Sequence, residues 1–71
     1  GISDLYFNND NQNELVLKVY GDFGDVIYTD TTNNTKFILD RSFFSSGMYY
    51  FSCENLNTRN IINGKALFLN P

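Results

Sequence analysis

The chain has 71 residues, with five Lys and Arg against eight Asp and Glu and a net charge of −3. This length fits one domain, which we expect over residues 1–71. The sequence has no basic stripe of the kind that nucleic-acid binding needs, and its excess of acidic residues disfavours docking on anionic lipid. Because no apolar run approaches the ~20 residues that span a bilayer, we expect no nucleic-acid partner and no membrane insertion.

Apolar and polar residues alternate with a period of two along most of the chain, which is typical of β-strands. A short apolar piece at 5–7 is followed by expected strands at 14–20, 25–29, 36–39, 48–53 and 65–69. Connections are expected at 8–13, 21–24, 30–35, 40–46 (one helical turn), 55–60 and 63–64. Short strands at intervals of about 8–12 residues predict an all-β fold, a small immunoglobulin-like sandwich of roughly six or seven antiparallel strands.

The alternation also assigns side chains to the core. The residues expected to face inward are Leu17, Val19, Phe37, Leu39, Tyr49, Phe51 and Leu69. Phe43 and Phe44 should lie under the edge of the sheet. Some of Tyr20, Tyr28 and Tyr50 should point outward, either as a contact row for sugar or protein or as ordinary exposed tyrosines.

The segment from Ser45 to Cys53 is the most informative part of the sequence. Gly47 ends a run of small residues and permits a turn with positive φ. Tyr49 follows two residues later, where its ring can be buried while its hydroxyl reaches back to the turn. With Phe51 this is the layout of the tyrosine corner of immunoglobulin-like sandwiches, and we predict a structural corner of Gly47, Tyr49 and Phe51.

The residue types argue against catalysis. The chain has no histidine, the usual general base at neutral pH. Asp22 and Asp25 flank a turn, where carboxylates commonly accept local backbone N–H groups. The lone Cys53 is expected to be buried and inert. We therefore predict that the protein is not an enzyme, with no catalytic residue, no cofactor and no metal ligand, a weak calcium site at Asp10 to Glu14 being the alternative to a solvated turn.

One predicted loop contains two candidate glycosylation sites. Asn33 begins the triplet Asn-Asn-Thr, which fits the N-glycan acceptor sequence. Thr31 lies in Asp-Thr-Thr, which resembles the acceptor motif for O-glycans in Bacteroidetes. A plain solvated loop is the alternative reading of both.

Four segments together resemble a known family, the C-terminal sorting domains of the type IX secretion system of Bacteroidetes. The hairpin LVLKVY with Gly24 and VIY is similar to the family's "VxVYDxxGxxV", and FILD resembles its "xxIDLS" strand. FSSGMYYF is similar to "LxxGxYxxxV", and GKALFL resembles the closing "GKxxxL". The match covers Leu15 to Asn70. The family's early "PNP" segment is missing, and Gly21 stands where the family has Asp.

The resemblance implies a non-catalytic module at the end of a secreted or cell-surface protein, which secretion machinery recognises. The recognition residues it implies are Gly47, Tyr49, Gly64 and Lys65. An edge charge that blocks sheet association is the alternative role of Lys65. The alternative function is an immunoglobulin-like structural or adhesion module, such as a phage decoration or surface-protein domain, with a neighbouring domain or a second copy as its partner.

Overall fold

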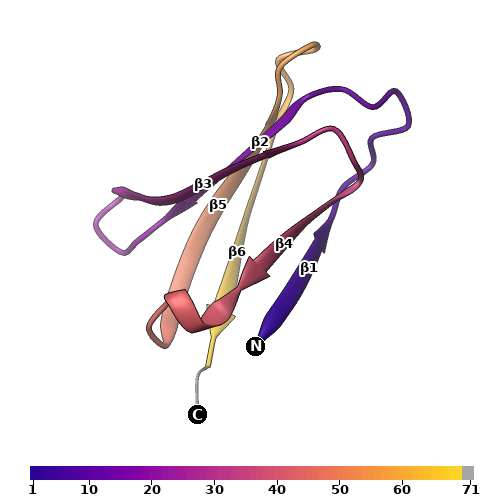
Figure 1. Ribbon diagram of the computed structural model, residues 1–71. Helices are drawn as coiled ribbons and strands as arrows, with labels where there is room; N and C mark the ends of the chain where they lie inside the picture. The colour runs from indigo at the N-terminus through magenta and orange to yellow at the C-terminus, as the bar shows by residue number, and fades with distance from the viewer. Residues whose placement is uncertain (70–71) are drawn as a thin grey trace.

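The strands form two antiparallel sheets that face each other across one apolar core (Figure 1). This computed structural model describes residues 1–69. Its strands are β1 (Ile2–Tyr6), β2 (Leu15–Tyr20), β3 (Val26–Thr32), β4 (Lys36–Asp40), β5 (Gly47–Asn55) and β6 (Ile61–Phe68). A 3-10 turn, η1 (Arg41–Phe43), follows β4, and no helix within residues 1–69 is long and apolar enough to cross a membrane. The prediction of a small all-β sandwich is confirmed.

The larger sheet has the strand order β3-β2-β5-β6. One of its two central strands, β2, buries Leu15, Leu17 and Val19 on one face, as the alternation predicts. In the ladder, Cys53 of β5 lies opposite Leu17 and Phe51 lies opposite Val19, so both project from the same face toward the core. The other face of this sheet is turned away from the core.

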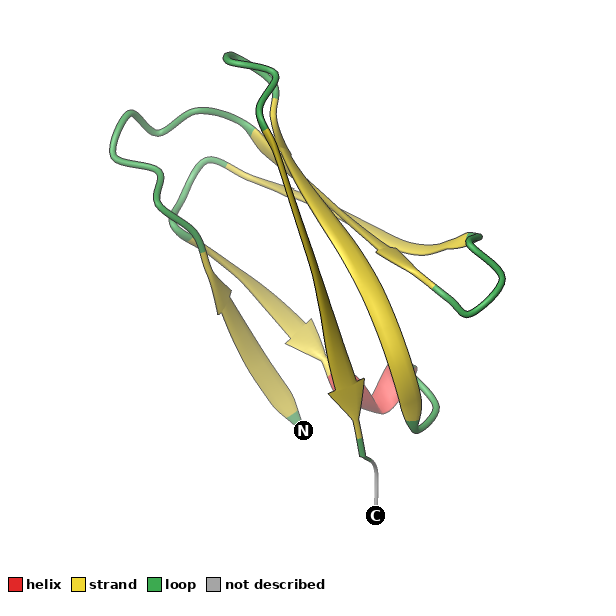
Figure 2. Cartoon of the chain, turned by 180° about the vertical axis from the view of Figure 1, so that it is seen from behind, coloured by secondary structure: helices red, strands yellow, loops and turns green. Residues whose placement is uncertain are grey.

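The smaller sheet pairs β1 with β4 and covers the apolar, core-facing side of the larger sheet (Figure 2). Phe37 and Leu39 of β4 are buried, and Leu5 lies opposite Phe37 in the ladder. The alternate side chains, such as Ile38, are exposed on the outside. Because the smaller sheet has two strands and the larger has four, the cover is narrower than the surface beneath it.

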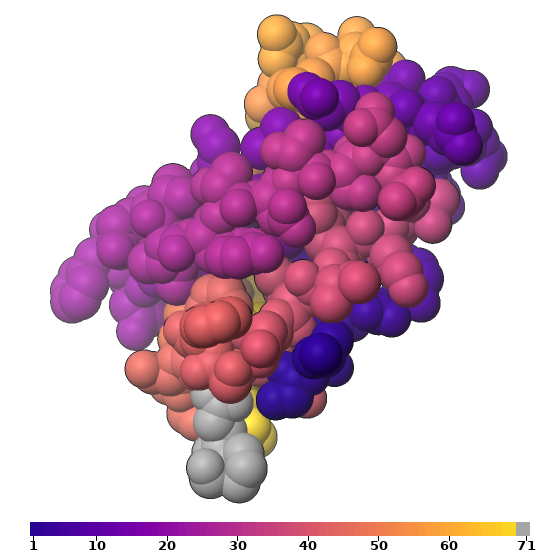
Figure 3. All heavy atoms as spheres, viewed as in Figure 1, coloured from indigo at the N-terminus to yellow at the C-terminus, as the bar shows by residue number. Residues whose placement is uncertain are grey.

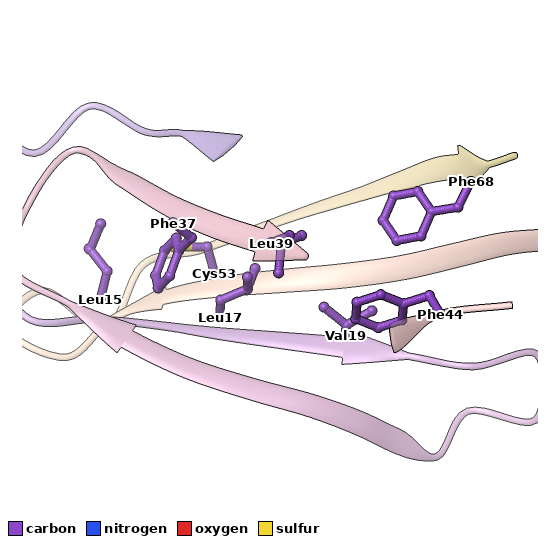
Figure 4. Packing of buried hydrophobic residues seen from close by; sticks show 8 residues of the cluster. All are labelled: Leu15, Leu17, Val19, Phe37, Leu39, Phe44, Cys53 and Phe68. Atoms are coloured by element: carbon purple, nitrogen blue, oxygen red, sulfur yellow. The ribbon is translucent and has the colours of Figure 1, made fainter. Parts of the chain in front are cut away.

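Phe44 closes one end of the core (Figure 4). Its ring makes edge contacts with the rings of Tyr28, Tyr49 and Phe68, with centroids 5.4–5.8 Å apart. Edge-to-face geometry of this kind is the favoured arrangement of aromatic rings. The η1 turn aims Phe44 inward, and Asp40 caps this turn by accepting from the backbone N–H of Ser42 at 3.0 Å.

Several predicted boundaries and orientations are wrong. The Asn63-Gly64 pair is no turn, because both residues lie within β6, which begins at Ile61 rather than Lys65. The loop predicted at 30–35 is shorter, because β3 continues through Thr32. Phe68, rather than Leu69, is the buried residue at the end of β6, and Leu69 is 70% exposed.

One of the two aromatic residues that were predicted to lie under the edge of the sheet does not lie there. Phe43 is 81% exposed while its neighbour Phe44 is buried, since only one of two adjacent side chains at the end of a tight turn can face the core. Of the three tyrosines from which some were expected to point outward, Tyr28 faces inward, because it lies opposite Val19 and contacts Phe44. A bulge between Val19 and Tyr20 shifts the register of β3 beyond this point.

A buried amide joins two of the Asn-rich loops. Asn9 is 5% exposed, and its Nδ2 donates to the carbonyl oxygens of Asn13, Asn33 and Asn34 at 2.8–3.1 Å. Its Oδ1 accepts from the backbone N–H of Asn13 at 3.0 Å. Asn9 therefore ties the β1–β2 connection to the β3–β4 connection, and it satisfies backbone groups that belong to neither sheet.

Candidate functional site

Two of the three residues predicted for the corner, Gly47 and Tyr49, lie at the start of β5. The hydroxyl of Tyr49 donates to the carbonyl oxygen of Ser45, four residues earlier, at 2.7 Å. Its ring is partly buried against Phe44 and Phe68. Gly47 has φ of 154°, a backbone region that other residues rarely adopt, and nothing lies within 4 Å of the position of a Cβ there. The corner therefore fixes the entry of the chain into β5 through one hydrogen bond and one glycine conformation.

The third corner residue, Phe51, packs against Gly64 instead of the turn. A Cβ at Gly64 would lie 2.7 Å from two carbon atoms of the Phe51 ring, and these residues are opposite each other in the β5–β6 ladder. Gly64 thus makes room for the ring of Phe51 within the sandwich. The sequence predicts a turn at Asn63-Gly64, but this contact with Phe51 accompanies an extended strand there.

The four candidate recognition residues do not share one surface. Tyr49 lies opposite Ala66 on the core-facing side, and Gly64 lies beneath Phe51 on that same side. Lys65 is exposed on the outer side, as expected for its neighbouring position in the strand. A single partner docking on a face of the sheet therefore reaches the side chain of Lys65 and not that of Tyr49.

Lys65 belongs to a row of side chains that crosses the outer face of the larger sheet. The ladder places Val26 opposite Tyr20, Tyr20 opposite Tyr50, and Tyr50 opposite Lys65. Tyr50 is 47% exposed and Val26 is 50% exposed. We call these four residues the outer row. Of the three tyrosines considered for an outward position, Tyr20 and Tyr50 are in this row, and Tyr28 is not.

Polar neighbours flank the outer row. Lys18 lies opposite Ser52 in the β2–β5 ladder, on the same face of the sheet as the Tyr20–Tyr50 pair and two positions along from it. The Ser52 hydroxyl is 3.4 Å from the Tyr20 hydroxyl. Two ammonium groups, Lys18 and Lys65, therefore accompany two phenol rings on one face. Phenol rings supply flat amphipathic contact area, and lysines supply charge, so this face can dock an acidic or mixed protein surface or stack against a sugar.

A second candidate site is an open groove of about 320 Å³ at the end of the sandwich where the Asn-rich loops gather. Its apolar wall includes Phe7, Leu15, Cys53 and Ile62. Its polar rim is formed mostly by asparagines of the loops at 8–13 and 55–60. No motif in the sequence indicates this groove, because its walls come from two stretches, 7–15 and 53–62, that are far apart in the chain.

Cys53 is the only sulfur nucleophile of the chain, and it lies in this wall. Its residue is 3% exposed, and burial raises the pKa of the thiol. A raised pKa keeps the sulfur protonated, which is the state of an inert cysteine. Within residues 1–69, no cluster of three or more Asp, Glu, Cys or His side chains has the arrangement of a metal site.

The two glycosylation candidates fall in different settings. Thr31 lies within β3, not in a loop as predicted, although its side chain is exposed. Asn33 is in the turn after β3, where its Nδ2 donates to the carbonyl oxygen of Gln12 at 3.2 Å. An N-linked sugar on Asn33 would replace one proton of that amide and crowd this contact between loops.

No family model, curated protein or solved structure matches the chain. The surfaces of the chain that can take a ligand or partner are the outer row with its lysines, the groove and the sheet edges.

Proposed function

We propose that this protein is a non-catalytic recognition module of the immunoglobulin-like type, and that it acts as a C-terminal sorting domain for export and cell-surface attachment through a type IX system. Its partner is then a protein of the secretion machinery. The sequence resemblance motivates the family, and two features of the fold are consistent with it.

The first feature is topological. The order β3-β2-β5-β6 matches the C′-C-F-G sheet of variable-type immunoglobulin domains, and β1-β4 then takes the place of strands B and E. In that correspondence β5 is strand F. The hydrogen bond from Tyr49 to Ser45 at its start is then in the position of the tyrosine corner. This agreement supports the immunoglobulin-like class.

The observation that carries the recognition role is the outer row. It combines exposed Tyr50 with Lys65, the one basic residue that the family resemblance singles out. Both side chains lie outside the core, so neither is needed to hold the sheets together. A surface of this composition, aromatic at its centre and charged at its side, is typical of protein contact sites.

Export of a reporter tests the proposal. Residues 1–71 are fused to the C-terminus of a periplasmic reporter in a host that has the type IX apparatus, and surface or extracellular reporter is measured. We expect export of the fusion and a loss of about tenfold with Tyr50→Ser plus Lys65→Gln. The matched control is Lys36→Gln on the smaller sheet, which should export normally. Retention of the unmodified fusion in the periplasm contradicts the proposal.

The alternative function is a structural or adhesion module that assembles with neighbours. Within residues 1–69 no strand pairs with the outer edge of β1, and this favours the alternative, since free edges are templates for association. Gene context separates the two functions, because a sorting domain ends a longer secreted chain whereas an accessory module stands alone or in tandem copies.

A further inference from the structure

We infer that the free edge of β1 is a binding site for an extended polypeptide segment that adds a third strand to the smaller sheet, with apolar residues facing inward and a Lys or Arg facing outward. The inference concerns a different surface from the outer row, and it holds whichever of the two proposed functions is correct.

The hydrogen-bond pattern fixes which backbone groups the edge offers. Phe7 donates its N–H to the carbonyl oxygen of Thr35, and Gly1 accepts from the N–H of Arg41, both at 2.7 Å. Odd-numbered residues of β1 therefore point their backbone groups toward β4. Because these groups alternate along an antiparallel strand, the N–H and C=O groups of Ile2, Asp4 and Tyr6 point to the open edge.

The other sheet edges are blocked in ways that β1 is not. A bulge disrupts the pairing of β3, and Lys65 stands on β6. The second edge of the smaller sheet lies beside β3, where β3 and β4 contact each other (Figure 3). Bulges, edge lysines and covering segments are the usual protections against strand addition. The sequence of β1, Ile-Ser-Asp-Leu-Tyr, contains no Lys, Pro or Gly.

The core beside this edge is incompletely covered. Ile62 projects from the core-facing side of β6, opposite buried Cys53, yet it is 57% exposed. It lines the open groove together with Phe7, which follows β1 directly. Figure 2 shows that β1 lies on the side of β4 away from β3, so that an added strand would extend the smaller sheet toward the β6 side of the larger one.

The register then defines the chemistry of the incoming strand. Its residues opposite Ser3 and Leu5 face the core and should be apolar, because they would cover Ile62 and the groove. Its residue opposite Asp4 faces outward. The Oδ2 of Asp4 lies 3.7 Å from the Nζ of Lys36, yet 37% of the Asp4 side chain remains exposed, so its negative charge can take a second partner, and Asp10 lies on the rim of the groove. A Lys or Arg opposite Asp4 complements that charge.

The same charge argues against a second copy as the occupant. Two β1 strands paired antiparallel over their full length would place Asp4 directly opposite its equivalent in the other copy. Like charges that face each other across a ladder destabilise the pair. An apolar segment of another protein that carries a Lys or Arg opposite Asp4 has no such conflict.

A titration with isotope-labelled protein tests the inference. The probe is a synthetic peptide of about seven residues with the core Thr-Val-Lys-Val-Thr, and the readout is the backbone amide spectrum. We expect the amide signals of Ile2, Asp4 and Tyr6 to shift, and their exchange with solvent to slow. A peptide with Glu in place of Lys should bind about fivefold more weakly.

Two variants make the result specific to this edge. Asp4→Arg, an exposed change that leaves the core intact, should reverse the preference so that the Glu peptide binds better. Asp4→Pro should abolish binding of both peptides, because it removes an N–H that the edge offers and β4 does not use. If Asp4→Pro fails to fold, the peptide preference of Asp4→Arg alone tests the inference.

Three outcomes would overturn the inference. The first is a titration in which the peptide shifts the amides of β6 or β3 instead, or shifts none at millimolar concentration. The second is binding that ignores the charge at position 4. The third is a shift of the β1 amides on concentrating the protein without peptide, which would make a second copy the occupant.

Discussion

The ring of Phe51 covers the backbone of Gly64, its partner in the β5–β6 ladder, at a distance that leaves no room for a Cβ. Glycine weakens a strand because it has no side chain to pack, and an aromatic ring from the next strand can replace the missing contact. Here this pairing lets Phe51 lie flat along the sheet, where it packs against the core cluster.

Gly64→Ala is therefore expected to destabilise the protein, although alanine is the better strand residue. The added methyl would meet ring carbons of Phe51 at 2.7 Å and force the ring to move. Overpacking of this kind costs about 1–3 kcal/mol of unfolding free energy, which urea denaturation can measure. Gly21→Ala is the matched control, since its methyl would meet the flexible end of Asp25 at 3.2 Å and Ile27 at an ordinary contact distance of 3.7 Å. Equal stability of the two variants would contradict the argument.

Tyr49→Phe should destabilise the protein by about 1 kcal/mol, because it removes one hydrogen bond and leaves the carbonyl of Ser45 without this donor. The ring contacts with Phe44 and Phe68 remain. The control is Tyr50→Phe on the outer face, where the hydroxyl is exposed, and we expect its melting temperature to equal that of the wild type. If both variants have the melting temperature of the wild type, the Tyr49 hydroxyl contributes nothing to stability.

Gly47→Val tests the other half of the corner by a different route. No atom lies within 4 Å of the position of its Cβ, so the first carbon of the new side chain meets nothing. The expected cost of about 1–3 kcal/mol comes from the φ of 154° that valine must adopt. Unchanged stability in urea would mean that the backbone relaxes there without cost.

The residues that the sequence predicted correctly are those whose position depends on alternation alone. Leu17 and Val19 on β2 and Phe37 and Leu39 on β4 are all buried as predicted. Alternation works here because a strand covered on one side must place every second side chain in the core.

The errors arose where a local signal competed with a long-range contact. Asn-Gly is a strong hairpin signal, yet at Asn63-Gly64 the ring of Phe51 selects an extended strand instead. The bulge beside Tyr20 and the choice of Phe44 over Phe43 are likewise set by packing between segments. The outer row and the edge of β1 could not be located before the strand order was known, because each depends on which strands are neighbours.

Asn9→Asp should be among the most destabilising single-atom changes in the chain. The Nδ2 of Asn9 faces three carbonyl oxygens, and a carboxylate oxygen in its place would repel all three. Leaving a buried charge without a partner costs about 3 kcal/mol or more. The loss should shrink as the pH falls below the carboxyl pKa, because a protonated acid can donate one hydrogen bond. Asn8→Asp, at an exposed neighbouring position, is the control, and an equally small effect of both changes on thermal unfolding would contradict the role of Asn9.

Alkaline pH should weaken the fold partly through Cys53. Burial raises the pKa of its thiol in the folded state, so the folded protein holds the proton more tightly than the unfolded chain. The stability that this difference contributes is complete below the ordinary thiol pKa, and it is lost as the pH rises through that value toward the folded-state pKa. The unfolding free energy of Cys53→Ala, although lower at neutral pH because of the cavity, should therefore decline less steeply between about pH 8 and 10. Parallel pH profiles for the variant and the wild type, or rapid alkylation of Cys53 in the folded protein at pH 8, would show that the thiol ionises as freely as in an unfolded chain.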